Sequence, residues 1–288
     1  MTYPDEALSH FAELDILRCV QLETEAASVR YQAVDVPRAI LLAGQPGAGK
    51  TVLSDMFVSE FKDNVAFVNG DDYRRQHPHY RELYGKYGSD FVDLVSPFSN
   101  QVSNKLIDIY SDQHFHLIVE GTGRTVQVPL STSEMLSRKG YSVEMSVIAA
   151  KPLVSLISTL LRFYNMNKVG TVPRATAIAA HDNVVDVLPH NLDILRNVPT
   201  ISRMTIWTRE RDLLYDSECN HSMPSRALID YWDLEWTEEE IESVRRSIDS
   251  IREFEESFHL GQSAVIQEIE RRMEQQLSPS GLSYDLTL

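Results

Sequence analysis

The stretch Arg38-Ala-Ile-Leu-Leu-Ala43, followed by Gly44-Gln-Pro-Gly-Ala-Gly-Lys-Thr51, sets the fold class of this 288-residue chain. Its first part is a short run of apolar residues without polar alternation, which is typical of a strand buried on both faces of a sheet. Glycine and proline between residues 44 and 49 predict a tight turn, and residues 50–62 carry a helical pattern. Strand, glycine-rich turn and helix in this order predict an α/β protein.

The turn also has the Gly-x-x-x-x-Gly-Lys-Thr pattern, which binds phosphate when it lies between a strand and a helix. Its glycines let backbone amides face phosphate oxygens, and the helix N-terminus adds positive potential. Lys50 would reach the β- and γ-phosphates and Thr51 would ligate Mg²⁺, whereas the alternative is a plain turn with Lys50 in solvent. The residues predicted to bind the nucleotide are Gly44, Gln45, Pro46, Gly47, Ala48, Gly49, Lys50 and Thr51.

Further apolar runs follow along the chain, separated by segments with helical periodicity. Parallel strands need such crossovers, because each connection must bring the chain back in the same direction. We therefore predict a parallel sheet with helices on both faces. The runs are residues 65–68, 117–119, 143–149 and 204–207, and the helical segments lie around 101–112, 131–139, 151–165 and 175–196.

Helical patterns also occupy both ends of the chain. Apolar residues recur at spacings of three and four from Asp5 to about Tyr31. After about Asn220 the strands stop, and Thr237-Glu-Glu-Glu240 is a capping box that starts a helix. Gly261 is predicted to end that helix, and a second one follows. The predicted organisation is an N-terminal helix packed on the core (1–35), a phosphate-binding core (36–220), a helical extension (221–277) and a flexible tail (278–288).

The net charge of −15, from 42 acidic and 27 basic residues, argues against binding to a nucleic-acid backbone. The negative charge lies at the two ends: residues 1–35 hold 7 acidic and 2 basic side chains, and residues 229–288 hold 15 and 5. The 20 acidic and 20 basic residues between them balance, so a locally basic phosphate site is compatible with the overall charge.

Two features favour the cytoplasm. Cys19 and Cys219 are far apart in the sequence, which suits free thiols in a reducing compartment. The first twenty residues lack the basic and apolar regions of a signal peptide, and no stretch approaches eighteen apolar residues. We expect no membrane span and a cytoplasmic location.

Asn69-Gly-Asp-Asp72 follows the apolar run 65–68. Carboxyl ends of parallel strands face the ligand crevice, so a carboxylate here would point toward the γ-phosphate. It could orient a substrate hydroxyl and accept its proton during phosphoryl transfer. The residues themselves leave open whether Asp71 or Asp72 has this role, and either could simply cap the next helix.

Glu120-Gly-Thr-Gly-Arg-Thr125 follows another apolar run. Glu120 stands where an acidic residue often follows a strand in nucleotide-binding proteins, the glycines permit close approach to a ligand, and Arg124 offers a forked donor. A salt bridge between Glu120 and Arg124 is the alternative.

Arg162 and Arg174 lie in a region with few other basic residues. Guanidinium groups directed at a transferring phosphoryl group stabilise the charge on its oxygens. Ordinary surface arginines are the alternative reading.

Several motifs in order resemble the zeta toxin family, the kinase half of the epsilon/zeta toxin–antitoxin systems, and most closely its PezT branch. The resemblance runs from about residue 30 to 260. The motifs are LLAGQPGAGKT (41–51), NGDDYRRQHPHY (69–80), LIVEGTGRTVQVP (117–129), LLRFY with Arg162, PRAT (173–176) and RERDLLYDSE (209–218).

The resemblance implies a P-loop kinase-like fold in a bacterial cytoplasmic enzyme. Zeta toxins transfer the γ-phosphate of ATP to the 3′-hydroxyl of the amino sugar of UDP-N-acetylglucosamine, which blocks peptidoglycan synthesis. The implied cofactors are Mg²⁺ and ATP, with GTP as an alternative nucleotide. An antitoxin protein that blocks the ATP cleft is the implied partner, with no nucleic acid and no membrane.

Position by position, the resemblance assigns the general base to Asp71, the P-loop lysine to Lys50 and the transition-state arginines to Arg162 and Arg174. The family commonly has a glutamate near the substrate where this chain has Asn104, which can hydrogen-bond a sugar hydroxyl but brings no charge. The implied substrate-binding residues are Asp71, Asn104, Glu120, Gly121, Thr122, Arg124 and Thr132.

Two other functions remain open. A kinase of the same superfamily could phosphorylate another nucleotide or an antibiotic hydroxyl. A nucleotide-gated regulatory binding protein could also use the P-loop, although such a switch has no need of Asp71, Arg162 and Arg174 together.

Overall fold

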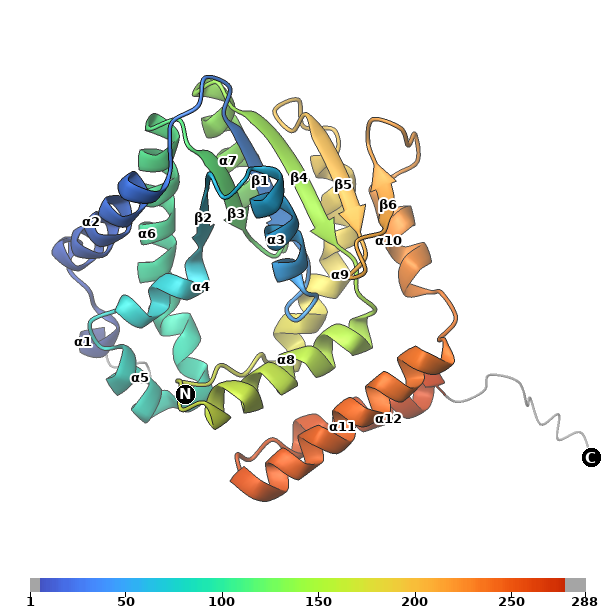
Figure 1. Ribbon diagram of the computed structural model, residues 1–288. Coiled ribbons are helices and arrows are strands. Elements are labelled where there is room, and N and C mark those ends of the chain that lie inside the picture. Colours follow the sequence, from blue (N-terminus) through green and yellow to red (C-terminus); the bar gives the residue numbers. More distant parts are fainter. Residues whose placement is uncertain (1–5, 278–288) are drawn as a thin grey trace, which may run out of the picture.

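The computed structural model describes residues 6–277, and the apolar runs form five strands of one six-stranded sheet (Figure 1). The strand order is β2-β3-β1-β4-β5-β6, and β6 alone runs antiparallel to its neighbour. The predicted α/β class and mainly parallel sheet are confirmed. The strands are β1 (Arg38–Ala43), β2 (Val65–Asn69), β3 (His116–Glu120), β4 (Ser142–Ile148), β5 (Arg203–Trp207) and β6 (Leu213–Asp216).

Helices cover both faces of the sheet because successive strand residues point to opposite sides. In β1, Leu41 and Ala43 face one helical layer, and Ile40 and Leu42 face the other. The second face packs on α3 (Lys50–Glu60). The first packs on α2 (Glu13–Arg30), α6 (Val92–Asp112), α7 (Gln127–Arg138), α9 (Ile178–Leu195) and α10 (Pro224–Trp232).

Short helices after β2 form a separate lobe, which contacts α6 (Figure 1). Leu83, Phe91 and Val95 make a small apolar cluster of their own there. The lobe contains α4 (Gly70–Tyr73), α5 (Tyr80–Tyr87) and two 3₁₀ turns (Arg74–Gln76 and Gly88–Phe91), and it contacts α1 (Glu6–Ser9).

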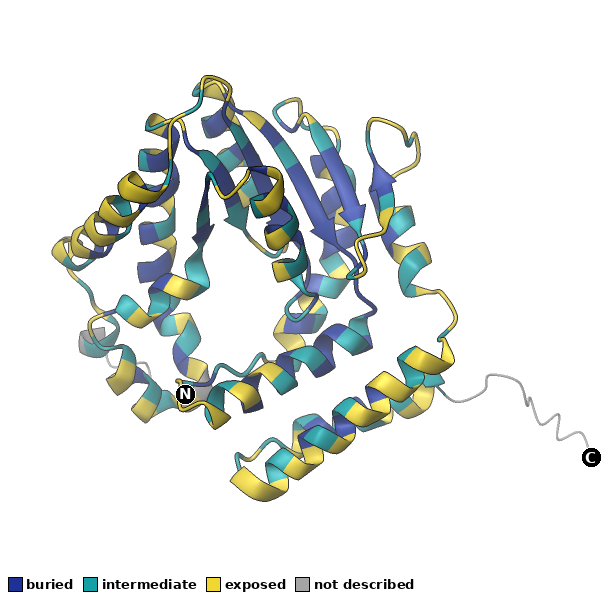
Figure 2. Ribbon diagram, viewed as in Figure 1, coloured by how far each residue is buried: buried dark blue, intermediate teal, exposed yellow. Residues whose placement is uncertain are grey.

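The C-terminal hairpin, α11 (Glu238–Phe258) and α12 (Ser263–Leu277), packs on α8 (Pro152–Lys168). Its apolar stripes join α8 in a cluster separate from the sheet core, and its outer faces are exposed (Figure 2). Thr237 and Glu240 form the predicted capping box.

Several elements differ from the sequence prediction. The N-terminal helix is interrupted after Ser9, and α11 ends at Phe258 with His259 in the left-handed conformation, before the predicted Gly261. The edge strand β6 and the helices α4, α5 and α10 were not predicted, because short polar-flanked elements carry little periodic signal. The predicted flexible tail, 278–288, lies outside the described residues.

None of the helices within residues 6–277 is both long enough and apolar enough to span a membrane.

Candidate active site

The glycine-rich loop joins β1 to α3, and its backbone requires glycine. Gly47 has a φ of +76°, and a Cβ at this position would lie 2.1 Å from the Ser155 carbonyl oxygen. Gly49, at the N-cap of α3, has a φ of +99°. The loop therefore presses against the start of α8 in a conformation that side chains disfavour.

Lys50 begins α3 and turns back across the loop. Its Nζ donates to the Gly44 carbonyl at 3.1 Å and lies 3.9 Å from Glu120 Oε1. Burial lowers the pKa of Lys50, and the charge of Glu120 opposes that shift. The ammonium group is thus poorly hydrated and available to an anion in the cleft.

Glu120 ends β3, beside the ends of the two neighbouring strands. It pairs in register with Leu42 of β1 and Asn69 of β2. Burial raises the pKa of Glu120, with Lys50 acting against it. The strand ends therefore bring the loop, Glu120 and the Asn69 motif to one edge of the sheet, as the sequence predicts.

Asp71 lies in the first turn of α4, where the Asn69 side chain accepts a hydrogen bond from its backbone amide at 3.0 Å. Its carboxylate lies 2.7 Å from Arg74 Nη1 and 3.0 Å from Arg174 Nη1. Asp72, the other candidate, is exposed, and burial of part of its carboxyl raises its pKa. The two aspartates thus occupy different environments, with Asp71 bound between two guanidinium groups.

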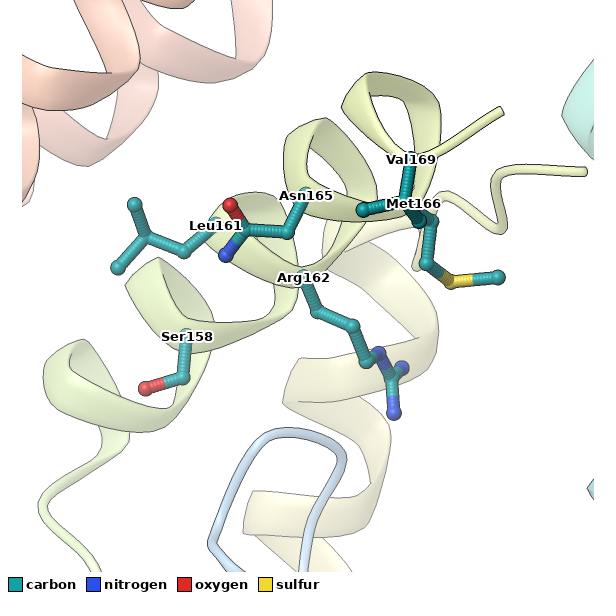
Figure 3. A pocket seen from close by; sticks show the side chains of 6 residues that line it. All are labelled: Ser158, Leu161, Arg162, Asn165, Met166 and Val169. Carbon is teal, nitrogen blue, oxygen red and sulfur yellow. The ribbon is translucent and has the colours of Figure 1, made fainter. Parts of the chain in front are cut away.

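Arg162 extends from α8 on the side away from Leu161 (Figure 3). Its Nη2 lies 3.5 Å from the Thr176 hydroxyl, in the segment that carries Arg174. Arg162 is accessible to solvent, yet the surrounding protein lowers its pKa, and the nearby charge of Arg174 adds to this effect. Lys50, Arg74, Arg162 and Arg174 make the site locally basic, in contrast to the chain as a whole.

The loop after β3 is held from behind by α9. Asn191 Nδ2 donates to the carbonyls of Gly123 and Arg124, both at 2.9 Å. Thr122 is half-buried, whereas Gly121 and the Arg124 side chain are exposed. The Glu120–Arg124 salt bridge weighed as an alternative is not formed, since Glu120 faces Lys50.

Asn104 on α6 and Thr132 on α7 line one hollow of about 400 Å³. The Ser103 hydroxyl lies 3.4 Å from the Cβ position of Gly70, so this part of α6 adjoins the turn that carries Asp71. The hollow is lined by Asn104, Lys105, Ile107, Asp108, Ser131, Thr132 and Met135.

A second hollow, of about 440 Å³, follows one side of α8 (Figure 3). Ser158 and Arg162 supply polar groups, and the remaining lining is largely apolar. At one end of this lining, the Ser158 hydroxyl accepts a hydrogen bond from Arg209 Nη2 at 3.2 Å.

Sequence reasoning missed two arginines of the site. Arg209, after β5, donates from Nε to the Ala48 carbonyl at 2.8 Å and from Nη2 to the Gly47 carbonyl. It supports the loop from outside. Arg74 forms an ion pair with Asp71, three residues earlier in the sequence. This spacing could have predicted the ion pair, because side chains three residues apart are neighbours on a helix.

Among residues 6–277, no group of three or more His, Cys, Asp or Glu side chains could hold a metal ion. The Thr51 residue is exposed in the first turn of α3, where its hydroxyl could bind a hard cation. Mg²⁺ fits such a position, since it keeps several waters and takes oxygens from substrate phosphates.

Comparison with known proteins identifies the family of this chain. A family model described as Zeta toxin matches residues 23–220. The chain is 37% identical to toxin PezT of Streptococcus pneumoniae over 210 residues, which cover 73% of this chain and 83% of the relative. It is 40% identical to toxin zeta of Streptococcus pyogenes over 187 residues, 65% of each chain.

A solved structure from the PezAT chromosomal toxin–antitoxin system of Streptococcus pneumoniae superposes with a TM-score of 0.77 and 30% identity. The match covers 85% of this chain and 99% of that one. An AvrRxo1-ORF1:-ORF2 complex, with a TM-score of 0.55 and 12% identity over 90% of this chain and 84% of that one, shares the fold alone. The family match over residues 23–220 includes the glycine-rich loop and the motifs at Asn69 and Glu120. This chain therefore belongs to the zeta toxin family.

Proposed function

We propose that this protein is a toxin-type kinase that transfers the γ-phosphate of ATP to the 3′-hydroxyl of the amino sugar of UDP-N-acetylglucosamine. The observation that carries the proposal is the position of Asp71 at the end of β2, between Arg74 and Arg174, at the same sheet edge as Lys50. A base, phosphate-binding groups and further cations therefore occupy one site.

The loop 44–51 would bind the phosphates of ATP. Its backbone amides and the N-terminus of α3 supply partial positive charge, and Lys50 supplies a full charge. Mg²⁺, held by Thr51 and phosphate oxygens, would neutralise part of the charge on the transferring group. GTP remains the alternative nucleotide.

Asp71 would accept the proton of the substrate hydroxyl. The hydroxyl oxygen would then form a bond to the γ-phosphorus while the bond between that phosphorus and ADP breaks. Arg74 and Arg174 fix the orientation of the carboxylate. Asn69 fixes the turn beneath it.

Arg162 and Arg174 would stabilise the transferring phosphoryl group. Arg174 contacts Asp71 through Nη1, and a guanidinium has five N–H donors in all. Its remaining donors can therefore bind phosphate oxygens while the Asp71 contact persists.

The sugar nucleotide would bind on the side of α6, α7 and the loop after β3. Gly121, Thr122 and Arg124 lie on that loop, and Glu120 directly precedes it at the end of β3. Asn104 and Thr132 supply an amide and a hydroxyl from the hollow between the two helices. These neutral groups suit hydrogen bonds to sugar hydroxyls.

Asn104 also favours a second candidate, the same chemistry on another nucleotide or on an antibiotic hydroxyl. It is exposed at the hollow and carries no charge where the family commonly has a glutamate. A different acceptor would leave the roles of Lys50, Asp71, Arg162 and Arg174 unchanged.

We further propose a cytoplasmic antitoxin partner that blocks the nucleotide cleft. Support comes from the similar structure, which belongs to a toxin–antitoxin system. Mixing the chain with the product of an adjacent gene and measuring ATP-analogue binding tests this proposal, and undiminished binding in a stable complex contradicts it.

The acceptor is tested by incubating the purified protein with ATP, Mg²⁺ and UDP-N-acetylglucosamine and recording the mass of the nucleotide sugar. We expect a gain of one phosphate. An unmodified sugar nucleotide together with phosphorylation of another compound in a parallel panel of nucleotides and aminoglycosides would support the second candidate instead.

A further inference from the structure

The C-terminal hairpin, α11 and α12, is tied by polar side chains to the back of the glycine-rich loop. It lies beyond residues 23–220, which match the family model. Apolar packing on α8 explains why the hairpin folds there. It does not require the two polar connections that also join the hairpin to the core.

The first connection runs through Lys151, which directly precedes α8 and is 3% exposed. Its Nζ donates to Glu240 Oε2 at 3.0 Å and to the Glu235 carbonyl at 3.1 Å. It also lies 4.4 Å from the centre of the Trp236 ring. All these partners lie in the first turn of α11 or directly before that helix, and they offset the cost of burying the ammonium group.

The second connection begins at Arg272 of α12. Its two terminal nitrogens donate to the Asp182 carboxylate at 2.9 and 2.7 Å. Asp182 Oδ1 lies 3.1 Å from Nδ1 of His181, a residue with no exposed surface. His181 Nε2 lies 2.8 Å from the Ser155 hydroxyl of α8.

A single direction of hydrogen bonding is consistent with the contacts that run from Asp182 through His181 and Ser155 to Gln45. The Asp182 carboxylate can only accept, so the proton of a neutral His181 belongs on Nδ1. Nε2 then accepts from the Ser155 hydroxyl, whose oxygen accepts from Gln45 Nε2 at 3.3 Å. The Pro152 carbonyl, at 2.9 Å, is the other acceptor within reach of the Ser155 hydroxyl. Successive donors and acceptors in one direction strengthen one another.

Both connections end at Gln45, the second residue of the loop. Its Nε2 donates to the Ala150 carbonyl at 2.7 Å, next to Lys151, and to the Ser155 hydroxyl. The side chain is completely buried, and its Oε1 has no hydrogen-bond partner among the described residues. Gln45 therefore depends on these two acceptors for its position.

We infer that the C-terminal hairpin positions the nucleotide-binding loop, through Arg272, Asp182, His181 and Ser155 on one side and Glu240 and Lys151 on the other. Loss of the hairpin contacts frees α8 and α9 to shift, and Gln45 shifts with them. Arg272 is a positioning residue in this scheme. The inference rests on the proposed binding of ATP to this loop.

The test compares Arg272→Ala with Arg271→Ala in the full chain. Arg271 is the neighbouring arginine, and it is exposed and pairs with Glu268. We expect Arg272→Ala to weaken binding of a non-hydrolysable ATP analogue by about threefold to tenfold. Arg271→Ala should bind the analogue as the wild type does.

Ser155→Ala provides a milder break in the same connection, in case Arg272→Ala fails to fold. It removes one hydroxyl from a buried position and leaves the surrounding apolar contacts. We expect it to raise KM for ATP with little change in kcat. Combined with Arg272→Ala, it should cost less than the sum of the two single effects, because both act through one pathway.

Hydrogen exchange of the loop without nucleotide separates this inference from the proposed function. Residues 44–50 should exchange faster in Arg272→Ala than in Arg271→Ala, whether or not the wild type binds ATP. Faster exchange in a protein that never binds ATP would overturn the proposed function and keep the inference. Folded Arg272→Ala and Ser155→Ala proteins with wild-type loop exchange and wild-type analogue affinity would overturn the inference.

Discussion

Gly47 shows how a single residue sets the shape of the phosphate site. Its φ of +76° and the carbonyl of Ser155 directly behind it leave no room for a side chain. Replacement by alanine must either move the loop away from α8 or strain the backbone, at a cost of about 1–3 kcal/mol.

We predict that Gly47→Ala lowers the free energy of unfolding by at least about 1 kcal/mol. Gly85→Ala is the matched control, since Gly85 lies within α5 and a Cβ there meets nothing within 4 Å. That control should be neutral or stabilising by up to about 1 kcal/mol. Urea unfolding measures both, and equal stabilities for the two variants would show that the loop tolerates a side chain.

At the residue scale, the sequence identified the groups with strong motif signals. Glu120 ends β3, Asp71 lies two residues after β2, and Lys50 begins the helix after the glycine-rich loop. The structure places all three at the same edge of the sheet. Arg209 has no comparable signal, because its partners are backbone carbonyls more than 150 residues away in sequence. Contacts to main-chain atoms leave no trace in side-chain patterns.

Among the elements, the loop after β5 supports the glycine-rich loop through Arg209. Its guanidinium spans the carbonyls of Gly47 and Ala48 and also reaches the Ser158 hydroxyl at 3.2 Å. Burial lowers the pKa of Arg209. These hydrogen bonds hold the outer side of the loop through its carbonyl groups.

We predict that Arg209→Ala raises KM for ATP by about tenfold, with a smaller effect on kcat, since it removes charged hydrogen bonds to the loop. Arg211→Ala serves as control because Arg211 is exposed in the same turn. Steady-state kinetics at varied ATP concentrations measure the effect. An unchanged KM in a folded Arg209→Ala protein would remove Arg209 from the site.

Element prediction succeeded where burial creates a regular pattern. The five parallel strands and the long helices α3, α6, α7, α8 and α9 have continuous apolar runs or stripes. β6 was missed because it is a short edge strand with two of four residues buried. The break between α1 and α2 was missed because the apolar spacing continues through it.

For the molecule as a whole, positive charge is concentrated at the candidate site and negative charge in the two end segments of the chain. Lys50, Arg74, Arg162 and Arg174 lie at the candidate site, and acidic residues prevail at the two ends of the chain. The exposed faces of α11 and α12 carry much of that acidity (Figure 2). The sequence charge alone could locate this excess but could not reveal the buried polar contacts beneath it.

The buried histidine between hairpin and core predicts a pH dependence. Burial lowers the pKa of His181 below its usual 6.5, Asp182 opposes this shift and Arg272 adds to it. The unfolded chain therefore binds more protons than the native one as pH falls below about 6.5, and this contribution to stability is lost there.

We predict that the free energy of unfolding falls less between about pH 7.5 and 5.5 in His181→Gln than in the wild type. The Asp182 pKa is itself lowered, mainly by Arg272, so its titration lies below this range. Denaturant titrations at both pH values give the comparison. A wild-type slope in the variant would mean that folding does not lower the pKa of His181.

The direct test of the whole account compares the Asp71→Asn and Asp72→Asn variants. Mass spectrometry measures the rate at which each variant transfers phosphate to UDP-N-acetylglucosamine. Asp71 lies between Arg74 and Arg174, whereas Asp72 is exposed beside it. We predict that Asp71→Asn loses at least about 10²-fold in rate while still binding ATP, and that Asp72→Asn retains most activity. Near-wild-type transfer by Asp71→Asn would contradict the account.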